Sequence, residues 1–363
     1  MKLVMFQKAW DARLGSLVEN EVVDLNLACE AMLESRGERR ARQKAALMVP
    51  PETVRFLEGE DESMQAAREA LLWVASQGAK SQQVRGLDIV FRLDKVKLLA
   101  PVAKPSKIIC AAHNYHDFLK ELGMQPHKEP RLFAKFANAV AAYDDPIPRP
   151  AMTICLGYEA ELAFVVGKRC KHVPEEKAYD YIAGYMALND VSASDLTKRD
   201  GQNLRGKSFD AFAPMGPFLL TTDELPDPHN LSVKLKVNGK VLQESNTKQL
   251  VHNVPQLMAF CSQVFTLEPG DVVATGTPGG LAKDRKPPTF MNPGDIMETE
   301  IEKLGVMRNP ISKEKKPALH ERFQKVTLQP PNSSGLKRKR PFAKCKRPFI
   351  YKQRNWLNII FPL

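Results

Sequence analysis

The sequence predicts an α+β protein that is rich in β-strands, and three observations support this fold class. Pro-Gly-Asp and Asn-Gly turns follow one another closely between about residues 106 and 310 and separate short alternating segments. Helical spacing of Ala, Leu, Glu and Arg is concentrated in residues 25–48 and 61–77, and few helical patterns follow. The glycine pattern that is typical of doubly wound nucleotide-binding sheets is absent from the sequence.

The first part of the chain predicts short strands followed by helices. MKLVMF and RLGSLVENEVVDL have the character of strands joined by turns that contain Gly and Asn. The two helical patterns come next, and Pro50-Pro51 separates them. The prolines of LDKVKLLAPVAKPSK then indicate a linker. These segments predict a small N-terminal α/β domain over residues 1–95.

The segments that follow predict a larger β-rich domain over residues 96–310. VKLKVNGKVLQES predicts a hairpin with an Asn-Gly turn, and LEPGDVVATGTP and NPGDIMETEIEKLG each enter a strand through a Pro-Gly-Asp turn. A helix is expected over residues 254–265 with Pro255 in its first turn. A second short helix, over residues 174–182, leads into the strand IAGYMALND.

The net charge of +11 belongs to the end of the chain. Residues 311–363 contain 14 Lys or Arg and two Glu, so the preceding 310 residues carry a net charge of about −1. This Pro-, Ser- and Lys-rich tail has no apolar period and is predicted to be disordered. Its cluster Lys337-Arg338-Lys339-Arg340 is either a nuclear-import or polyanion-binding patch or a solvated extension. Nucleic acid is therefore not an expected partner of the body of the protein.

Cysteine usage and hydropathy indicate a soluble protein of a reducing compartment. The six cysteines are scattered without a Cys-x-x-Cys pair, which argues against a zinc ribbon or a disulfide framework. No run approaches the roughly 18 apolar residues of a membrane span, so no membrane partner is expected. The N-terminus contains Asp11 and lacks an Arg- and Ser-rich amphipathic stretch, which favours the cytoplasm.

The stretch GYEAELAFVVGK, residues 157–168, places two glutamates at the head of an apolar run. Glu159 and Glu161 are two residues apart, so in a β-strand both carboxylates project to the same face. Ala163 and Val165 continue that face, so the strand is predicted to be buried on both sides. Two poorly hydrated anions repel each other, so either one of them holds a proton or a cation lies between them.

A third carboxylate follows a neighbouring strand pattern. Asp190 ends the segment ALND, and Ser192 and Asp195 come soon after it. Three carboxylates from neighbouring strands suit Mg²⁺, which keeps several waters and exchanges them for substrate oxygens. Zinc and copper would recruit His or Cys instead.

Four motifs in this order give the sequence a resemblance to the fumarylacetoacetate hydrolase family. They are Glu159-x-Glu161, the Asp190 of NDVSASD, the Lys207 of GKSFDAF and the Thr277 of GDVVATGTP. The resemblance covers residues 96–310 well and the first 95 weakly, and the phrase RKPPTFMNPGDIMETEIEKLGV indicates one branch of the family. It implies a mixed β-roll catalytic domain of the C-terminal type of this family and a homodimer, and it adds a mitochondrial location as the alternative to the cytoplasmic one.

The resemblance also implies a metal site and a class of substrates. The substrates would be oxaloacetate, 3-acylpyruvates and related 1,3-dioxo acids, which chelate the metal through a carboxylate and a keto oxygen. The metal would be Mg²⁺, with Mn²⁺ or Ca²⁺ as alternatives, and would stabilise a developing enolate as a Lewis acid. The implied residues are the metal ligands Glu159, Glu161 and Asp190, the catalytic and substrate-binding Lys207, and the carboxylate-binding Gly276 and Thr277.

The lid segment departs from the family pattern. Where the family has Asn-Tyr-x-x-His-x-x-Glu, with a His and Glu that activate water, this chain has NYHDFLKE with Phe118 at the histidine position. Glu121 keeps its place and is a candidate proton shuttle, and His116 is a candidate only after a local rearrangement. His113 is interpreted as a polar lid residue. Ser194 also stands where the family has an arginine.

These departures favour one function among three. Phenylalanine cannot accept a proton, so carbon-carbon hydrolysis is disfavoured, and enolate chemistry of the oxaloacetate tautomerase or decarboxylase type is the first hypothesis. The alternative is a catalytically inactive family member that acts as a ligand-binding or scaffold protein. A polyanion-binding protein led by the basic tail is the third hypothesis.

Overall fold

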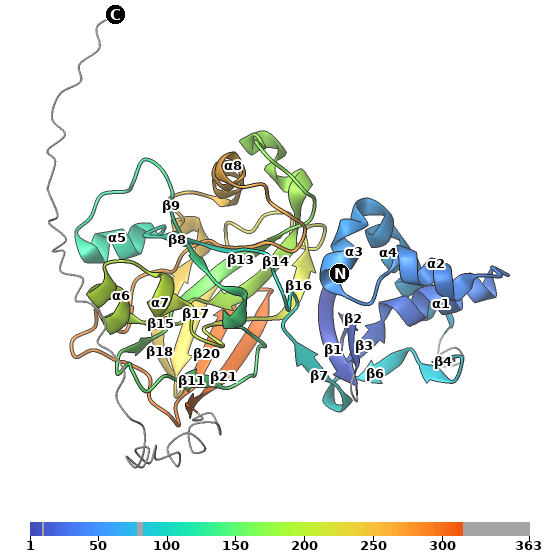
Figure 1. Cartoon of the computed structure of the whole chain (residues 1–363), viewed down its shortest axis with the longest axis horizontal. Helices are drawn as coiled ribbons and strands as arrows, with labels where there is room; N and C mark the ends of the chain where they lie inside the picture. The colour runs from blue at the N-terminus through green and yellow to red at the C-terminus, as the bar shows by residue number, and fades with distance from the viewer. Residues whose placement is uncertain (9–10, 78–82, 315–363) are drawn as a thin grey trace, which may run out of the picture. The chain divides into compact units, whose positions relative to one another are not determined.

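The computed structural model describes residues 1–8, 11–77 and 83–314, which belong to one compact unit, Met1–Lys315. It is an α+β structure rich in strands, so the predicted fold class is confirmed (Figure 1). Cys345 and the basic cluster at residues 337–340 lie outside the described residues. The division of the chain at residue 95 stays a prediction.

A large mixed sheet forms the centre of the structure. Its 12 strands run in the order β6-β3-β2-β1-β16-β14-β13-β19-β8-β9, with β10 paired to β16 and β7 paired to β1. The strands are β1 Lys2–Lys8, β2 Asp11–Val18, β3 Glu21–Asp24, β6 Val90–Arg92, β7 Lys97–Leu99, β8 Ile108–Ala112, β9 Arg131–Lys135, β10 Val140–Ala141, β13 Ala160–Val166, β14 Ile182–Asn189, β16 Ala213–Thr221 and β19 Val272–Ala274.

This sheet joins the N-terminal strands to the rest of the chain. Leu3 of β1 pairs with Leu219 of β16 in antiparallel register. The stretch predicted as a linker contributes β7, which pairs antiparallel with β1. Pro101 and Pro105, which indicated a linker, follow the end of β7, so they interrupt the chain just after this strand.

A five-stranded sheet has the order β11-β21-β20-β17-β18. Its β17–β18 hairpin has Asn238 and Gly239 at φ values of 51° and 77°, which confirms the predicted Asn-Gly turn. β21 continues to Lys313, three residues into the predicted tail, because Ile311 pairs with Ile147. The strands are β11 Ile147–Arg149, β17 Ser232–Val237, β18 Lys240–Asn246, β20 Ile296–Ile301 and β21 Gly305–Lys313, and two further pairs join β12 Leu156–Gly157 to β15 Ser192–Ala193 and β4 Gln83–Val84 to β5 Leu87–Asp88.

The helices predicted from the sequence are present, although one is divided and the one predicted at residues 174–182 is the 3-10 helix η4. The pattern at residues 25–48 forms two helices because Gly37, at φ 78°, follows the end of the first. The predicted helix at 254–265 is confirmed and begins with a capping box between Asn253 and Gln256. The helices are α1 Leu25–Ser35, α2 Ala41–Met48, α3 Thr53–Glu58, α4 Glu60–Gln77, α5 His116–Leu122, α6 Ser194–Asp200, α7 Leu204–Lys207 and α8 Val254–Val264, with 3-10 turns η2 Leu93–Lys95, η3 Ala137–Ala139, η4 Glu175–Tyr181 and η5 Thr247–Gln249.

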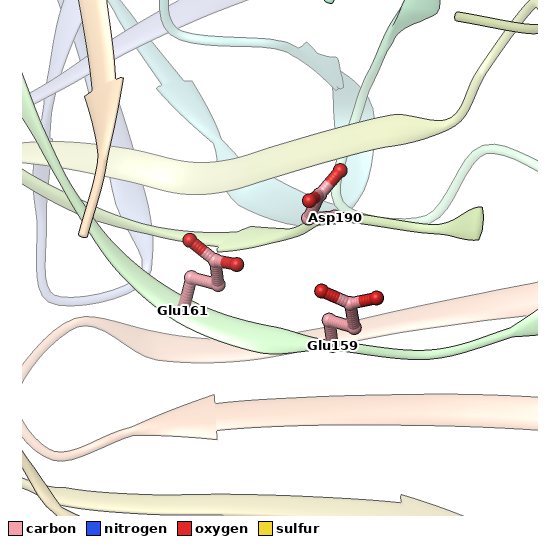
Figure 2. Close-up of side chains that lie close together, drawn as sticks. All are labelled: Glu159, Glu161 and Asp190. Atoms are coloured by element: carbon pink, nitrogen blue, oxygen red, sulfur yellow. The ribbon is translucent and has the colours of Figure 1, made fainter. Parts of the chain in front are cut away.

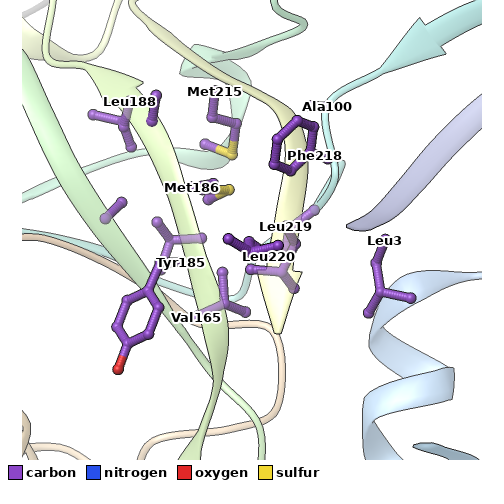
Figure 3. Close-up of a cluster of buried hydrophobic side chains, with 14 of the residues drawn as sticks. Leu3, Ala100, Val165, Tyr185, Met186, Leu188, Met215, Phe218, Leu219 and Leu220 are labelled. Carbon is purple, nitrogen blue, oxygen red and sulfur yellow. The ribbon is translucent and has the colours of Figure 1, made fainter. Parts of the chain in front are cut away.

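The hydrophobic core follows the central strands of the large sheet. Every residue of β13 and β14 is buried, which confirms the prediction that the glutamate-bearing strand is covered on both faces. Figure 3 shows side chains of β14 and β16 packed together, with Leu3 beyond them. Among the described residues, no helix combines the length and the apolar character that crossing a bilayer requires.

The Pro-Gly-Asp turn before β19 supplies a test of the fold. The Asp271 carboxylate is fully buried and accepts hydrogen bonds from Ser106 Oγ at 2.5 Å, Lys107 N at 2.9 Å and Glu268 N at 2.8 Å. Asp271→Ala leaves these donors unpaired, so we expect a loss of about 3 kcal/mol in the free energy of unfolding. Asp295→Ala, in the more exposed Pro-Gly-Asp turn before β20, is the matched control with an expected loss of about 1 kcal/mol. Equal losses in urea unfolding would contradict this assignment.

Candidate metal centre

Register in the large sheet brings the three predicted carboxylates together. β13 and β14 are antiparallel neighbours in which Ala160 pairs with Asn189, so Glu159 and Asp190 lie just beyond the two strand ends. Asp190 N donates to Glu159 O at 2.9 Å. One carboxylate oxygen from each of Glu159, Glu161 and Asp190 lies within 4.8 Å of the other two. Figure 2 shows the three carboxylates around a common space.

This arrangement fits a single divalent ion of the hard, oxygen-binding class. Two oxygens on opposite sides of Mg²⁺ are about 4.2 Å apart, and on Ca²⁺ about 4.8 Å, given metal–oxygen distances of about 2.1 and 2.4 Å. The limit of 4.8 Å on the observed spacings is therefore close to the span of one ion, and the carboxylates would move inward to bind Mg²⁺ together. The ligands are carboxylates without His or Cys among them, which suits Mg²⁺, Mn²⁺ or Ca²⁺.

Two buried lysines neutralise part of the negative charge of the three carboxylates. Lys207 Nζ of α7 donates to Glu159 Oε1 at 2.8 Å and to Asp190 Oδ2 at 2.6 Å, which places the predicted Lys207 at the triad. Lys135 Nζ, at the end of β9, donates to Asp190 Oδ1 and to Val191 O. Lys135 was not predicted from the sequence. With both lysines charged, three carboxylates still carry one negative charge in excess.

The pKa values of the three carboxylic acids shift in different directions, because the two lysines contact Asp190 and Glu159 but form no ion pair with Glu161. Burial disfavours the charged form of Asp190, but Lys135 and Lys207 outweigh burial and lower its pKa. Burial raises the pKa of Glu161 well above its ordinary 4.5, and repulsion from Asp190 and Glu159 adds to the shift. The pKa of Glu159 is raised by burial against the opposing effect of Lys207. Glu161 therefore keeps a proton most readily when no metal is bound.

Backbone and amide groups fix the orientation of the glutamates. Gly276 N donates to Glu161 Oε2 at 2.7 Å, so the N–H that was expected to face the substrate is engaged with a triad member. Gly276 has φ 100°, and a Cβ there would lie 2.9 Å from Asn114 Cβ. Thr277 is buried beside it, with Oγ1 accepting from Gln243 Nε2 at 2.9 Å.

The lid helix α5 is docked against the following loops. Phe118 is buried in a cluster with Tyr115, Leu250 and Leu281. Glu121 is exposed, and its Oε2 accepts from Gly280 N at 2.8 Å. His116 is exposed, and neither it nor Glu121 lines the cavity described next. The roles predicted for His116 and Glu121 stay predictions, and neither residue is in the wall of that cavity.

A cavity of about 100 Å³ opens beside Glu159 and Lys207. α5, α6 and α7 lie near one another around it (Figure 1), and Phe118, Ser194 and Thr277 contribute to its wall. A wider cleft of about 950 Å³ shares part of this wall, including His113, Phe133 and Lys283. The cavity therefore has an inner end at the triad and an outer end at the cleft.

Sequence reasoning missed or undervalued several residues of this site. Lys135 is the last residue of a strand pattern and gave no signal of a partner 55 positions away. Ser192, whose Oγ donates to Glu159 Oε1 at 3.0 Å, was noted only as a neighbour of Asp190. Gln243, which accepts from Ala160 N at 3.0 Å, lies in the predicted hairpin at an alternating position that faces inward. His113 was interpreted as a polar lid residue but lines the cavity.

Three acidic side chains, two of them buried and one half-buried, meet two buried lysines at one edge of a β-rich sheet, which defines a β-rich protein with a candidate site for a divalent metal. Comparison with known families then identifies the family. Residues 107–312 match the model described as fumarylacetoacetate (FAA) hydrolase C-terminal, which is more than half of the chain. The chain belongs to the fumarylacetoacetate hydrolase family, as the four motifs predicted.

Similar proteins extend this match. The chain is 40% identical over 316 residues to oxaloacetate tautomerase Fahd2a, mitochondrial, of Rattus norvegicus, covering 86% of this chain and 91% of the relative. It is 45% identical over 239 residues to oxaloacetate tautomerase fahd2, mitochondrial, of Xenopus laevis, covering 65% of this chain and 75% of that one. The phrase RKPPTFMNPGDIMETEIEKLGV indicated the branch called fumarylacetoacetate hydrolase domain-containing protein 2. The names of the rat and Xenopus relatives contain the abbreviation of that label.

A solved structure shares the fold as well. Maleylpyruvate hydrolase from Sphingobium sp. SYK-6, in complex with manganese(II) ion and pyruvate, matches with a TM-score of 0.65 and 28% sequence identity. The match covers 87% of this chain and all of that one. The homodimer and the location of this chain stay predictions.

The raised pKa of Glu161 predicts a pH-dependent stability of the metal-free protein. The folded chain keeps a proton on Glu161 at pH values where the unfolded chain has released it, so unfolding releases a proton and stability falls as pH rises above about 4.5. Glu161→Gln removes this loss. In EDTA, the variant should therefore gain stability relative to the wild type between about pH 5 and 8, measured by urea unfolding. A difference in stability that is independent of pH would contradict the protonation of Glu161.

Proposed function

We propose that this protein is a divalent-metal-dependent enzyme that interconverts the keto and enol forms of oxaloacetate. The observation that carries the proposal is the buried triad beside a small cavity, with lysines on two of its three carboxylates. The names of the rat and Xenopus relatives support oxaloacetate as the substrate. The manganese and pyruvate in the Sphingobium structure support a metal and a 2-oxo acid as ligands of this fold.

Glu159, Glu161 and Asp190 would hold the metal, for which Mg²⁺ is our first choice and Mn²⁺ or Ca²⁺ are alternatives. When bound, the metal supplies Lewis-acid stabilisation of negative charge on a keto oxygen. Lys207 and Lys135 keep Asp190 ionised and in place. Thr277 lines the cavity, which supports a role for it in binding a substrate carboxylate.

The wall of the cavity favours tautomerisation over hydrolysis. Hydrolysis needs a group that activates water, and at the lid position this chain has the buried, apolar Phe118. Glu121, the other member of the family's dyad, is engaged by Gly280 N outside the cavity. Tautomerisation needs only an electrophile and a proton carrier, so it does not depend on this dyad.

A second candidate function is binding of a 2-oxo acid without turnover. The replacement of two polar family residues by Phe118 and Ser194, both in the cavity wall, favours it. The two functions differ in a single assay. Metal-dependent binding of oxalate with no change in the keto–enol relaxation of oxaloacetate would support the binding protein, and accelerated relaxation would support the enzyme. Loss of CO₂ in the same assay would reveal decarboxylation.

Removal of the metal should abolish catalysis. We expect the purified protein in EDTA to leave oxaloacetate relaxation at its spontaneous rate, and excess Mg²⁺ or Mn²⁺ to restore the acceleration. Glu161→Gln, which preserves the lysine contacts of Glu159 and Asp190, should stay near the metal-free rate after Mg²⁺ is added. The measurement is the ultraviolet absorbance of the enol. Full activity in EDTA would refute metal dependence.

Replacement of the lid phenylalanine should change the reaction. Phe118→His places an imidazole in the cavity wall, so we expect hydrolysis of an acylpyruvate to rise by about tenfold or more. Phe118→Leu, which stays apolar, is the matched control and should leave hydrolysis at the wild-type level. Liquid chromatography of the released pyruvate reports the rate. An equal response of both variants would show that the lid side chain does not limit hydrolysis.

A further inference from the structure

His113 is the residue of the cavity wall that can exchange a proton near neutral pH. The titratable residues that line the cavity are His113, Glu159, Lys207 and Lys283. Glu159 and Lys207 are paired with each other at 2.8 Å. The lid residues His116 and Glu121 do not line the cavity, and Phe118 cannot titrate. Only an imidazole changes charge between about pH 5 and 8 without a large shift.

Two features of His113, its backbone conformation and its unpaired ring nitrogen, are typical of functional residues. It adopts φ 56°, a left-handed backbone conformation that is uncommon for residues other than glycine. Its Nδ1 is buried and has no hydrogen-bond partner within the part of the chain that the structure describes. Buried polar atoms are normally paired, so this nitrogen calls for an explanation.

The surroundings of the His113 ring hold it at the junction of the inner cavity and the outer cleft, both of which it lines. The centroids of the His113 and Phe118 rings are 5.8 Å apart, and the His127 ring stacks on the His113 ring at 5.8 Å. Burial and the nearby Arg131, His127 and Lys283 lower the pKa of His113 below 6.5. The ring is therefore neutral at neutral pH and can accept a proton.

We propose that the imidazole of His113 carries the proton between carbon and oxygen of the bound 2-oxo acid, in place of the lid histidine that Phe118 replaces. This role rests on the proposed function. The C3–H bond of keto oxaloacetate breaks, its proton goes to the imidazole, and its electron pair forms the C2=C3 bond as the carbonyl π pair moves to oxygen. The imidazolium then protonates that oxygen, which gives the enol and restores the neutral ring without any oxidation or reduction.

The test compares two histidines with the same backbone conformation. His113→Asn removes the proton carrier, and asparagine tolerates a left-handed φ, so the fold should be kept. His172→Asn is the matched control, because His172 is exposed, has φ 54° and lies outside the cavity wall. We expect His113→Asn to lower the catalysed rate by about 10²- to 10⁴-fold, with unchanged affinity for Mn²⁺. His113→Gln serves if the Asn variant does not fold.

A rescue variant separates proton transfer from a structural role. Phe118→His in the His113→Asn background returns an imidazole to the same cavity wall, so part of the tautomerase rate should return, by about tenfold or more. The acid limb of the wild-type pH profile, set by His113 beside Arg131, His127 and Lys283, should be absent from the His113→Asn variant. A rate that no imidazole restores, with an unchanged pH profile, would overturn the proposal.

A spectroscopic experiment tests the contact between His113 and the ligand without relying on turnover. In nitrogen NMR spectra of the histidine-labelled, Mg²⁺-loaded protein, oxalate should shift the His113 resonance and leave the His172 resonance in place. An unmoved His113 resonance would overturn contact with the ligand. An active wild type with an equally active His113→Asn variant overturns this role alone. A wild type that leaves oxaloacetate at its spontaneous rate overturns the proposed function and this role with it.

Discussion

Burial of three carboxylates at one point of a β-sheet requires positive charge at that point, and the site is organised around this requirement. Lys207 bridges Glu159 and Asp190, and Lys135 contacts Asp190 from the other side. The lysines leave Glu161 without an ion pair among the described residues, so its negative charge must be met by a proton or by a bound cation. A bound divalent ion would displace the proton, which would couple metal binding to the charge state of the site.

Sheet register supplies the precision that such a site needs. The two-residue period of β13 sets the separation of Glu159 and Glu161, and the antiparallel pairing with β14 brings Asp190 beside them. β19, the other neighbour of β13, ends just before Gly276, whose N–H orients Glu161. Each contact depends on strands buried on both faces, where a one-residue shift of register would turn every side chain to the opposite face and disrupt the packing on both.

The sequence predicted features set by local pattern and by motif order, and missed those set by pairing across the sheet. The Asn-Gly hairpin, the helix beginning at Val254 and the carboxylates of the triad followed from spacing within short segments. Lys135 contacts Asp190 across 55 positions, and no local pattern encodes that distance. His113 looked like any polar residue of a loop, because its φ and its orphaned nitrogen exist only in the folded chain.

The apolar lid and the choice of reaction have a common physical origin. Phe118 packs with Tyr115, Leu250 and Leu281 in the wall next to the cavity, where a polar dyad would instead order a water molecule. In the proposed reaction, an apolar wall that excludes water would strengthen the attraction between a developing enolate and the positive charges of the site, because fewer solvent dipoles would screen it. It would also withhold the nucleophile that hydrolysis consumes. A single change from an imidazole to a phenyl ring at position 118 would thus favour proton transfer within the substrate over cleavage of its carbon chain.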